Sequence, residues 1–366
     1  MRNRIKIIDA LRGVAALFVL LHHFMVFFSD ALENATNDSI NKILIFISDL
    51  NSEAVLFFFI ISGFCIGLSL NGSLPHKKRD VLLYIKKRFI RIMPIYFLAL
   101  FITFLVGVFT NSTNYDSSYK LSNLLGNLFF LQTPEGVKHW FSPYGHNGPL
   151  WSLSYEMFFY LFFLPFSYFL RKLSLKNINL ISFLLMGVTI ISLALNHLNL
   201  FTPWFSFLSI FIIWYYGYLL FSNHVHMKRY DVHFIFLFYI SIIICLNRSY
   251  IPSDTIYLVS KGLIMVSLLY SLIFMYRVNR VKIVLNTIER ITIFLFYQIG
   301  LGSYALYAFH YVILLMCAYF KLTLIETIVI LIISIICCIQ LEKFIIKIAS
   351  RFGSSKRLNK EIYPSH

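Results

Sequence analysis

The sequence predicts an all-α membrane protein, a polytopic helical bundle with about ten transmembrane helices. Hydrophobic residues make up 59% of the 366 residues, charged residues only 13%, and the mean hydropathy is +0.75. A soluble domain carries about 25% charged residues. Apolar stretches of about 20 residues recur along the chain, each long enough to cross a bilayer. Lysines and arginines gather in alternate connections between these stretches, which is typical of cytoplasmic loops.

The expected spans are defined by hydropathy and separated by polar connections. They cover residues 11–28, 53–70, 89–109, 149–170, 178–196, 204–222, 231–247, 256–276, 299–320 and 323–346. Two connections on the expected outer side are long, the acidic segment 29–52 and the Asn- and Ser-rich segment 110–148. Residues 121–131 of the Asn- and Ser-rich segment have an amphipathic pattern, and residues 282–298 are expected as a helix on the inner surface.

The distribution of basic residues places both termini in the cytoplasm. With that orientation the outer connections receive few basic side chains, namely Lys42, Lys120, Lys138, Arg248, Lys261 and Lys321. The pattern favours an even number of spans, the first retained as a signal-anchor. We therefore expect a transmembrane domain over residues 1–346 and a short, basic, disordered cytoplasmic tail over residues 347–366.

The net charge of +16 does not indicate nucleic-acid binding, because the basic side chains follow the loop pattern of a membrane protein. The five cysteines lie in apolar stretches without disulfide or metal spacing and are interpreted as small packing residues: Cys65, Cys245, Cys317, Cys337 and Cys338. His139 and His146, in the Asn- and Ser-rich segment, have no acidic or cysteine partner at metal spacing, so we expect no metal site.

The first span carries ionisable side chains, which in a membrane mark a functional site by default. Eleven residues turn a helix by roughly 1100°, so Arg12 and His23 share a face and lie roughly 16 Å apart along the axis. His22 points about 80° away from Arg12. Asp9 lies three residues before Arg12, so a helical ion pair is available. The alternatives are an arginine that reaches the lipid headgroups and a histidine hydrogen-bonded between helices.

Three further groups of polar residues lie in or beside apolar segments. Glu156 is a carboxylate seven residues into its span; it can orient an imidazole or form a purely structural buried pair. Arg88 and Arg91 share a helix face, and their planar guanidinium groups suit phosphates. Ordinary inner-side charge or lipid-headgroup binding is the alternative for the two arginines. Ser62, followed by Gly63, favours close helix packing over ligand contact.

A late segment carries a polar stripe that should face the bundle interior or a cavity. It comprises Ser303, Tyr304, Tyr307 and His310, which follow one another at helical spacing. His310 is a reserve candidate for a catalytic base behind His23.

These segments, in this order, resemble the motifs of acyltransferase family 3, the membrane-bound acyltransferases that modify bacterial cell-surface sugars. The family has Arg, ten residues and His in its first span, then Phe-Phe-x-x-Ser-Gly-Phe, Arg-x-x-Arg before Pro, Trp-Ser-Leu-x-x-Glu, and Ser-Tyr-x-x-Tyr-x-x-His. The matching residues here are Arg12 and His23, Phe58 to Phe64, Arg88, Arg91 and Pro94, Trp151 to Glu156, and Ser303 to His310.

The resemblance implies an O-acyltransferase of the bacterial cytoplasmic membrane. It implies acetyl-CoA or another acyl-CoA as cytoplasmic co-substrate, no bound cofactor, and a carbohydrate acceptor on the outer side. O-antigen, exopolysaccharide, capsule, peptidoglycan and small glycosides are all compatible acceptors. Some members carry an additional extracytoplasmic hydrolase-like domain, which is not expected in this chain. Membrane lipids are the other expected partners.

On this basis Arg88 and Arg91 are expected to hold the donor phosphates, and Arg12 to help place the thioester. His23 is expected either to act as general base or to carry the acyl group covalently, with Glu156 orienting it. Expected supporting residues are Asp9, Ser62, Trp151, Ser152, Tyr304, Tyr307 and His310. The competing classes are a transporter or flippase for a polar lipid or glycan and a scaffold for a polysaccharide machine.

Overall fold

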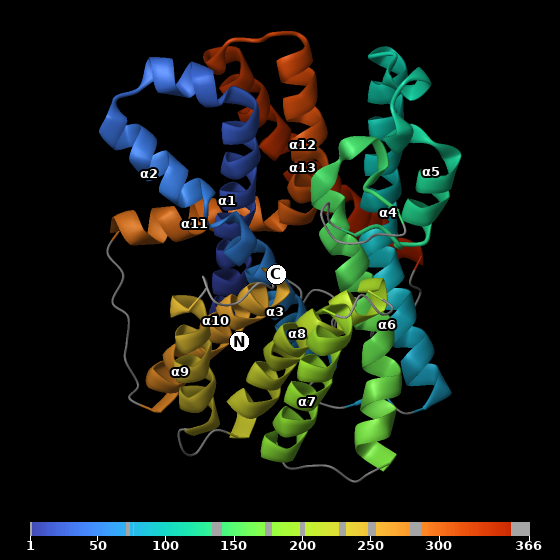
Figure 1. Ribbon diagram of the computed structural model, residues 1–366, viewed down its shortest axis with the longest axis vertical. Coiled ribbons are helices and arrows are strands. Elements are labelled where there is room, and N and C mark those ends of the chain that lie inside the picture. Colours follow the sequence, from blue (N-terminus) through green and yellow to red (C-terminus); the bar gives the residue numbers. More distant parts are fainter. Residues whose placement is uncertain are drawn as a thin grey trace.

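The computed structural model is helical throughout the part of the chain that it describes (Figure 1). That part comprises residues 2–70, 74, 75, 77–133, 141–172, 178–197, 202–226, 232–247, 254–278 and 287–352. His139 and the end of the predicted tail, residues 353–366, lie outside the described residues. Over this range the all-α prediction is confirmed, because the described residues form helices and no named strand.

The helices follow the predicted spans closely. They are α1 (Arg2–Ala35), α2 (Asp38–Ser48), α3 (Asn51–Leu70), α4 (Lys78–Phe109), α5 (Leu121–Leu128), α6 (Trp151–Lys172), α7 (Ile178–His197), α8 (Thr202–His226), α9 (Val232–Leu246), α10 (Asp254–Val278), α11 (Thr287–Leu301), α12 (Ser303–Tyr319) and α13 (Leu324–Phe352). Short 3₁₀ turns stand on either side of α5, namely η1 (Ser112–Asn114), η2 (Ser117–Tyr119), η3 (Tyr144–His146) and η4 (Gly148–Leu150).

Several of these helices are long and apolar enough to cross a membrane. Among the described residues there are 5, or up to 6 if the bent pair α11 and α12 forms one span. They are Lys6–Ala35, Asp38–Leu70, Lys78–Phe109, Gly148–Lys172 and Leu324–Ile348. Helices α7 to α10 contain shorter apolar stretches of 10–17 described residues. The chain is thus a multi-pass membrane protein, while the count of ten and the cytoplasmic termini stay predictions.

Two segments outside the predicted spans are helical where irregular chain was expected, namely the connection 29–52 and the start of the tail. Segment 29–52 is occupied by the end of α1, by α2 and by the start of α3. The Asn37 side chain accepts a hydrogen bond from the Ile40 backbone N–H and caps α2, which is the usual role of an N-cap residue. At the other end of the chain α13 continues to Phe352, so residues 347–352 of the predicted tail are helical.

The predicted ninth span, residues 299–320, is broken rather than continuous. α11 and α12 meet at Gly302 with a bend of 73°. In Figure 1, α11 lies across the view and α12 rises from its end. A side chain at residue 302 would overlap the backbone of Ile339 in α13, so the break depends on glycine. The bend places the first turn of α12 inside the bundle, beside α1, α4 and α13.

Glycine contacts bring two helix pairs to unusually close approach. A Cβ atom at Gly13 of α1 would overlap the carbonyl oxygen of Phe296, and one at Gly300 of α11 would overlap that of Asp9. A Cβ atom at Gly63 of α3 would likewise overlap the carbonyl oxygen of Trp214 in α8. Small residues at such crossings let backbones touch in membrane bundles. The first crossing fixes the turn that carries Arg12.

Candidate active site

A cavity of about 50 Å³ lies where α1, α3, α4, α6 and α12 meet. Its walls combine apolar side chains such as Phe58 and Ile92 with a polar set from all five sequence motifs. The polar lining consists of Arg12, Ser62, Arg91, Ser152, Glu156, Tyr160, Ser303, Tyr304 and Tyr307. Segments far apart in the sequence therefore converge on one interior point, which is expected of an active site within a membrane bundle.

Two hydroxyl groups hold the carboxylate of Glu156. The Ser62 hydroxyl donates to it at 2.8 Å, and the Tyr160 hydroxyl, one helical turn along α6, also donates to it. The Trp214 indole N–H in turn donates to the Ser62 oxygen at 3.2 Å. Ser62 thus contacts the site directly rather than serving helix packing alone. Sequence reasoning missed Tyr160, although its spacing of four residues from Glu156 places it on the same face.

The contact expected between Glu156 and His23 is not present between these two described residues. Glu156 bonds to Ser62 and Tyr160 instead, while the His23 ring contacts His310. The separation follows from the length of α1, because His23 lies roughly 16 Å beyond the Arg12 level that lines the cavity. A carboxylate one turn into α6 therefore cannot orient an imidazole that far along α1.

Arg12 and Arg91 share the cavity with two carboxylates nearby. Arg12 forms an ion pair with Asp9 at 3.6 Å, as the spacing predicts. Both arginines also lie within electrostatic range of Asp9 and of Glu342. The buried Glu342 of α13 accepts a hydrogen bond from the Ala305 backbone N–H at 3.4 Å, where the helix dipole of α12 favours an anion. Glu342 is a site residue that sequence reasoning missed.

Arg88 lies one turn before Arg91 and is only 7% exposed. Its guanidinium group donates to the Ser69 hydroxyl at 3.1 Å and lies against the rings of Tyr84 and Tyr160, 5.8 and 5.7 Å from their centres. Its Nε atom has no hydrogen-bond partner, and no carboxylate pairs with it among the described residues. A buried cation without an anion is costly, so the position suits an anionic ligand.

His23 and His310 form a pair between α1 and α12. His310 Nδ1 lies 3.0 Å from the Leu306 carbonyl oxygen, and its Nε2 lies 3.2 Å from Nδ1 of His23. His23 Nδ1 is also 2.9 Å from the Val19 carbonyl oxygen. When both rings are neutral, this network assigns the proton of each ring to Nδ1, which lies beside a backbone carbonyl oxygen. The Nε2 atom of His23 then carries no proton and is available as an acceptor. His22 points elsewhere, to Ser48 at 3.2 Å.

A line of polar and aromatic side chains connects the cavity with the histidine pair. The Ser152 and Tyr307 hydroxyl groups are 2.7 Å apart, and the Tyr307 ring centre is 5.9 Å from that of His310. The Tyr304 hydroxyl donates to the Ile92 carbonyl oxygen at 3.0 Å and joins α12 to α4.

Trp151 does not line the cavity. Its ring centre lies 5.1 Å from that of Tyr155 and 6.4 Å from that of Phe59.

A charged interior cavity in a multi-pass helical bundle, with a histidine pair beside it, defines an integral membrane protein with an enzyme-like site. The model of the family Acyl_transf_3, described as an acyltransferase domain, matches residues 5–342, nearly the whole chain. The chain belongs to acyltransferase family 3 and is a membrane acyltransferase by that membership. No curated protein and no solved structure matches it.

Proposed function

We propose that this protein is an O-acetyltransferase of the bacterial cytoplasmic membrane. It moves an acetyl group from cytoplasmic acetyl-CoA to a sugar hydroxyl of a surface or exported polysaccharide such as O-antigen, exopolysaccharide or capsule. The observation that carries the proposal is the convergence of all five family motifs on one interior cavity. Acetyl-CoA and the sugar are consumed, and CoA and the acetylated sugar leave, so this transfer needs no resident cofactor.

Arg88 and Arg91 bind the phosphates of the donor in this proposal. The buried guanidinium of Arg88 has an unfilled donor at Nε, and guanidinium groups pair with phosphates through two parallel hydrogen bonds. Arg12, at the cavity beside Arg91, directs the thioester end. The cavity of about 50 Å³ is smaller than a pantetheine arm, so donor entry must widen the cavity.

His23 acts as the general base. Its Nε2 accepts the proton of the acceptor hydroxyl as the sugar oxygen attacks the thioester carbonyl carbon. A new C–O bond forms, the C–S bond breaks, and the proton then passes to the CoA thiolate, which leaves as the thiol. His310 holds the His23 ring through the 3.2 Å contact. Covalent transfer of the acetyl group through His23 is the second form of the same proposal.

The proposal is tested by following the acetyl group itself. Membranes that contain this protein are incubated with acetyl-labelled acetyl-CoA and the host's surface polysaccharides, and label on glycan is measured. In parallel, mass spectrometry compares surface glycans from cells with and without the gene. We expect label on a glycan and, without the gene, loss of one acetyl group per modified sugar. Unlabelled, unchanged glycans would contradict acyl transfer and favour a transporter of a polar lipid or glycan.

Removing either donor arginine is expected to weaken the binding of acetyl-CoA. In Arg88→Ala or Arg91→Ala the apparent KM for acetyl-CoA should rise about 10- to 100-fold, because a hydrogen bond to a charged group contributes roughly 1.5–3 kcal/mol. The matched control is Lys86→Ala, a neighbouring basic residue of α4 that is exposed. An unchanged donor KM in both arginine variants would remove the phosphate-binding role.

A further inference from the structure

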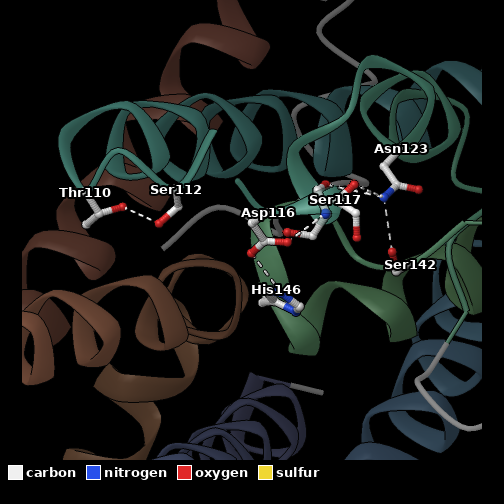
Figure 2. A network of polar contacts seen from close by, with 8 residues as sticks. Thr110, Ser112, Asp116, Ser117, Asn123, Ser142 and His146 are labelled. Atoms are coloured by element: carbon white, nitrogen blue, oxygen red, sulfur yellow. Dashed lines mark hydrogen bonds and ion pairs between the residues drawn. The ribbon is translucent and has the colours of Figure 1, made fainter. Parts of the chain in front are cut away.

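A second polar hollow lies beyond the end of α4, in the connection predicted to face outward. It is widely open at the protein surface and has a volume of about 560 Å³. Its lining consists of Thr110, Asn111, Ser112, Tyr115, Asp116 and Ser117, which we call the α4 basin. Figure 2 shows the polar contacts around it, with Asp116 turned toward His146 and Thr110 toward Ser112.

Hydrogen bonds hold the α4 basin in shape without a ligand. The Thr110 and Ser112 hydroxyl groups are 2.8 Å apart. Asp116 accepts a hydrogen bond from the Ser118 backbone N–H at 2.8 Å and contacts His146 Nε2 at 2.9 Å (Figure 2). These contacts use two of roughly four lone-pair positions of a carboxylate, so further hydrogen bonds can be accepted. A preformed site loses little entropy when a ligand binds.

The charge state of Asp116 is settled over the neutral range. Burial alone would raise its pKa, but the hydrogen bonds from Ser118 and the nearby His146 outweigh burial and lower the pKa below 3.8. Because the pKa of Asp116 is lower in the folded protein than its usual 3.8, the ionised carboxylate contributes fully to loop stability above that usual pKa. This contribution is lost as the pH falls through the folded-state pKa. Asp116 is therefore an ionised hydrogen-bond acceptor in neutral solution.

The ring of Tyr115 is 85% exposed at the edge of this polar surface. Tyrosine combines an apolar face with a hydroxyl group. Hydroxyl, amide and carboxylate groups beside one open aromatic ring match the alternating hydroxyls and apolar face of a sugar. We infer that the α4 basin binds a neutral oligosaccharide segment of the acceptor, an inference that rests on the proposed function.

The basin is suitably placed for a sugar next to the one that is acetylated. Along α4, Thr110 lies roughly 28 Å beyond Arg91, whereas His23 lies roughly 16 Å beyond Arg12 on α1. Arg12 and Arg91 line the same cavity, and α1 and α4 both run toward the top of the view in Figure 1. Measured along the helix axes, the basin is thus on the order of 12 Å beyond the His23 level, on the same side of the interior cavity.

One loop joins the basin to the interior site. His146, which contacts Asp116, is followed by Asn147, whose side-chain N–H₂ donates to Thr103 at 3.1 Å and to the Ala308 carbonyl oxygen at 3.3 Å. Ala308 is the neighbour of Tyr307 in α12. The same loop then enters α6 at the motif that contains Ser152 and Glu156. A sugar held in the basin is therefore fixed relative to α12 and α6.

The test separates acceptor binding from the chemical step. Tyr115→Ala and Asp116→Asn are compared with wild type in labelled-acetate transfer to neutral oligosaccharides released from the host's surface polysaccharide. We expect the acceptor KM to rise about 10-fold, with kcat and the KM for acetyl-CoA within about 2-fold. Phe129→Ala is the matched control, since Phe129 is an aromatic of the same connection, 73% exposed, that does not line the basin.

A further comparison distinguishes a binding role of Asp116 from a structural one. His146→Ala removes the Asp116 contact but leaves the carboxylate in the basin, so its acceptor KM should change less than that of Asp116→Asn. Equal effects in these two variants, or an unchanged KM in Tyr115→Ala, would overturn the inference.

Direct binding keeps the two proposals separable. Binding of the same neutral oligosaccharides to the full-length protein in lipid nanodiscs is measured without acetyl-CoA, with acidic oligosaccharides for comparison. We expect Tyr115-dependent retention of the neutral sugars, and stronger retention of acidic sugars would overturn the inference. Tyr115-dependent binding without any acyl transfer would uphold the basin and contradict the proposed function. Acyl transfer without Tyr115-dependent binding would uphold the proposed function and contradict the basin.

Discussion

Replacing His23 with alanine is expected to lower acetyl transfer by about 10²–10⁴-fold, the usual contribution of a general base. Nε2 of His23 is the acceptor that the His310 and Val19 contacts leave available. The more stringent variant is His23→Gln, which keeps a hydrogen-bond donor for His310 but cannot take up the hydroxyl proton. The measurement is transfer of label from acetyl-CoA to glycan at equal amounts of inserted protein.

His22 provides the matched control for this prediction. It is the neighbouring histidine of α1 and bonds to Ser48, away from α12. His22→Gln should therefore retain transfer within a few-fold of wild type, whereas both His23 variants lose it. Wild-type acetylation in His23→Gln would remove His23 from the mechanism. Equal loss in the His22 and His23 variants would show a structural role for the segment.

Replacing Gly63 with alanine is expected to cause a large loss of folded protein. The new Cβ atom would overlap the carbonyl oxygen of Trp214, and backbone cannot move aside as a flexible side chain can. Overpacking typically costs about 1–3 kcal/mol, occasionally more. Separation of α3 from α8 would also pull Ser62, which donates to Glu156, away from the Trp214 indole, so transfer should fall as well.

The thermal midpoint in detergent measures this effect. Gly187→Ala is the matched control, because a Cβ atom at Gly187 in α7 meets nothing within 4 Å. Alanine is favoured over glycine in a helix by about 0.5–1 kcal/mol, so this control should keep or slightly raise the midpoint. A Gly63→Ala midpoint equal to that of wild type would show that α3 and α8 are less closely packed than the structure has them.

Much of the fold was predictable because bilayer spans have a strong local signal. Except for the ninth, each predicted span lies in one helix apart from a few terminal residues, since length and hydropathy define a span without reference to its neighbours. The break at Gly302 was not predictable, because it depends on how closely α13 approaches that residue. The outer segment 29–52 was expected as a loop from its acidic residues, yet charges spaced along a helix surface do not interrupt it.

The site was predictable as a set of residue types but not as a set of contacts. The sequence by itself determined that Arg12 and His23 lie on one face of α1, because helix period fixes that angle. Glu342 is a carboxylate in an apolar span, and this feature of the sequence by itself indicates a functional residue. Nothing in the sequence indicated that Trp214 of α8 donates to Ser62, since that pair is separated by 152 residues.

The partners of the ionisable groups were decided only by the tertiary structure. Helix packing brings Ser62 to Glu156 and His310 to His23. The periodicity of one helix determines the direction in which a side chain points. Which side chain contacts it depends on the position and crossing angle of the neighbouring helix. The sequence therefore determined the spans and their polar faces, and the packing of those spans determined which faces meet.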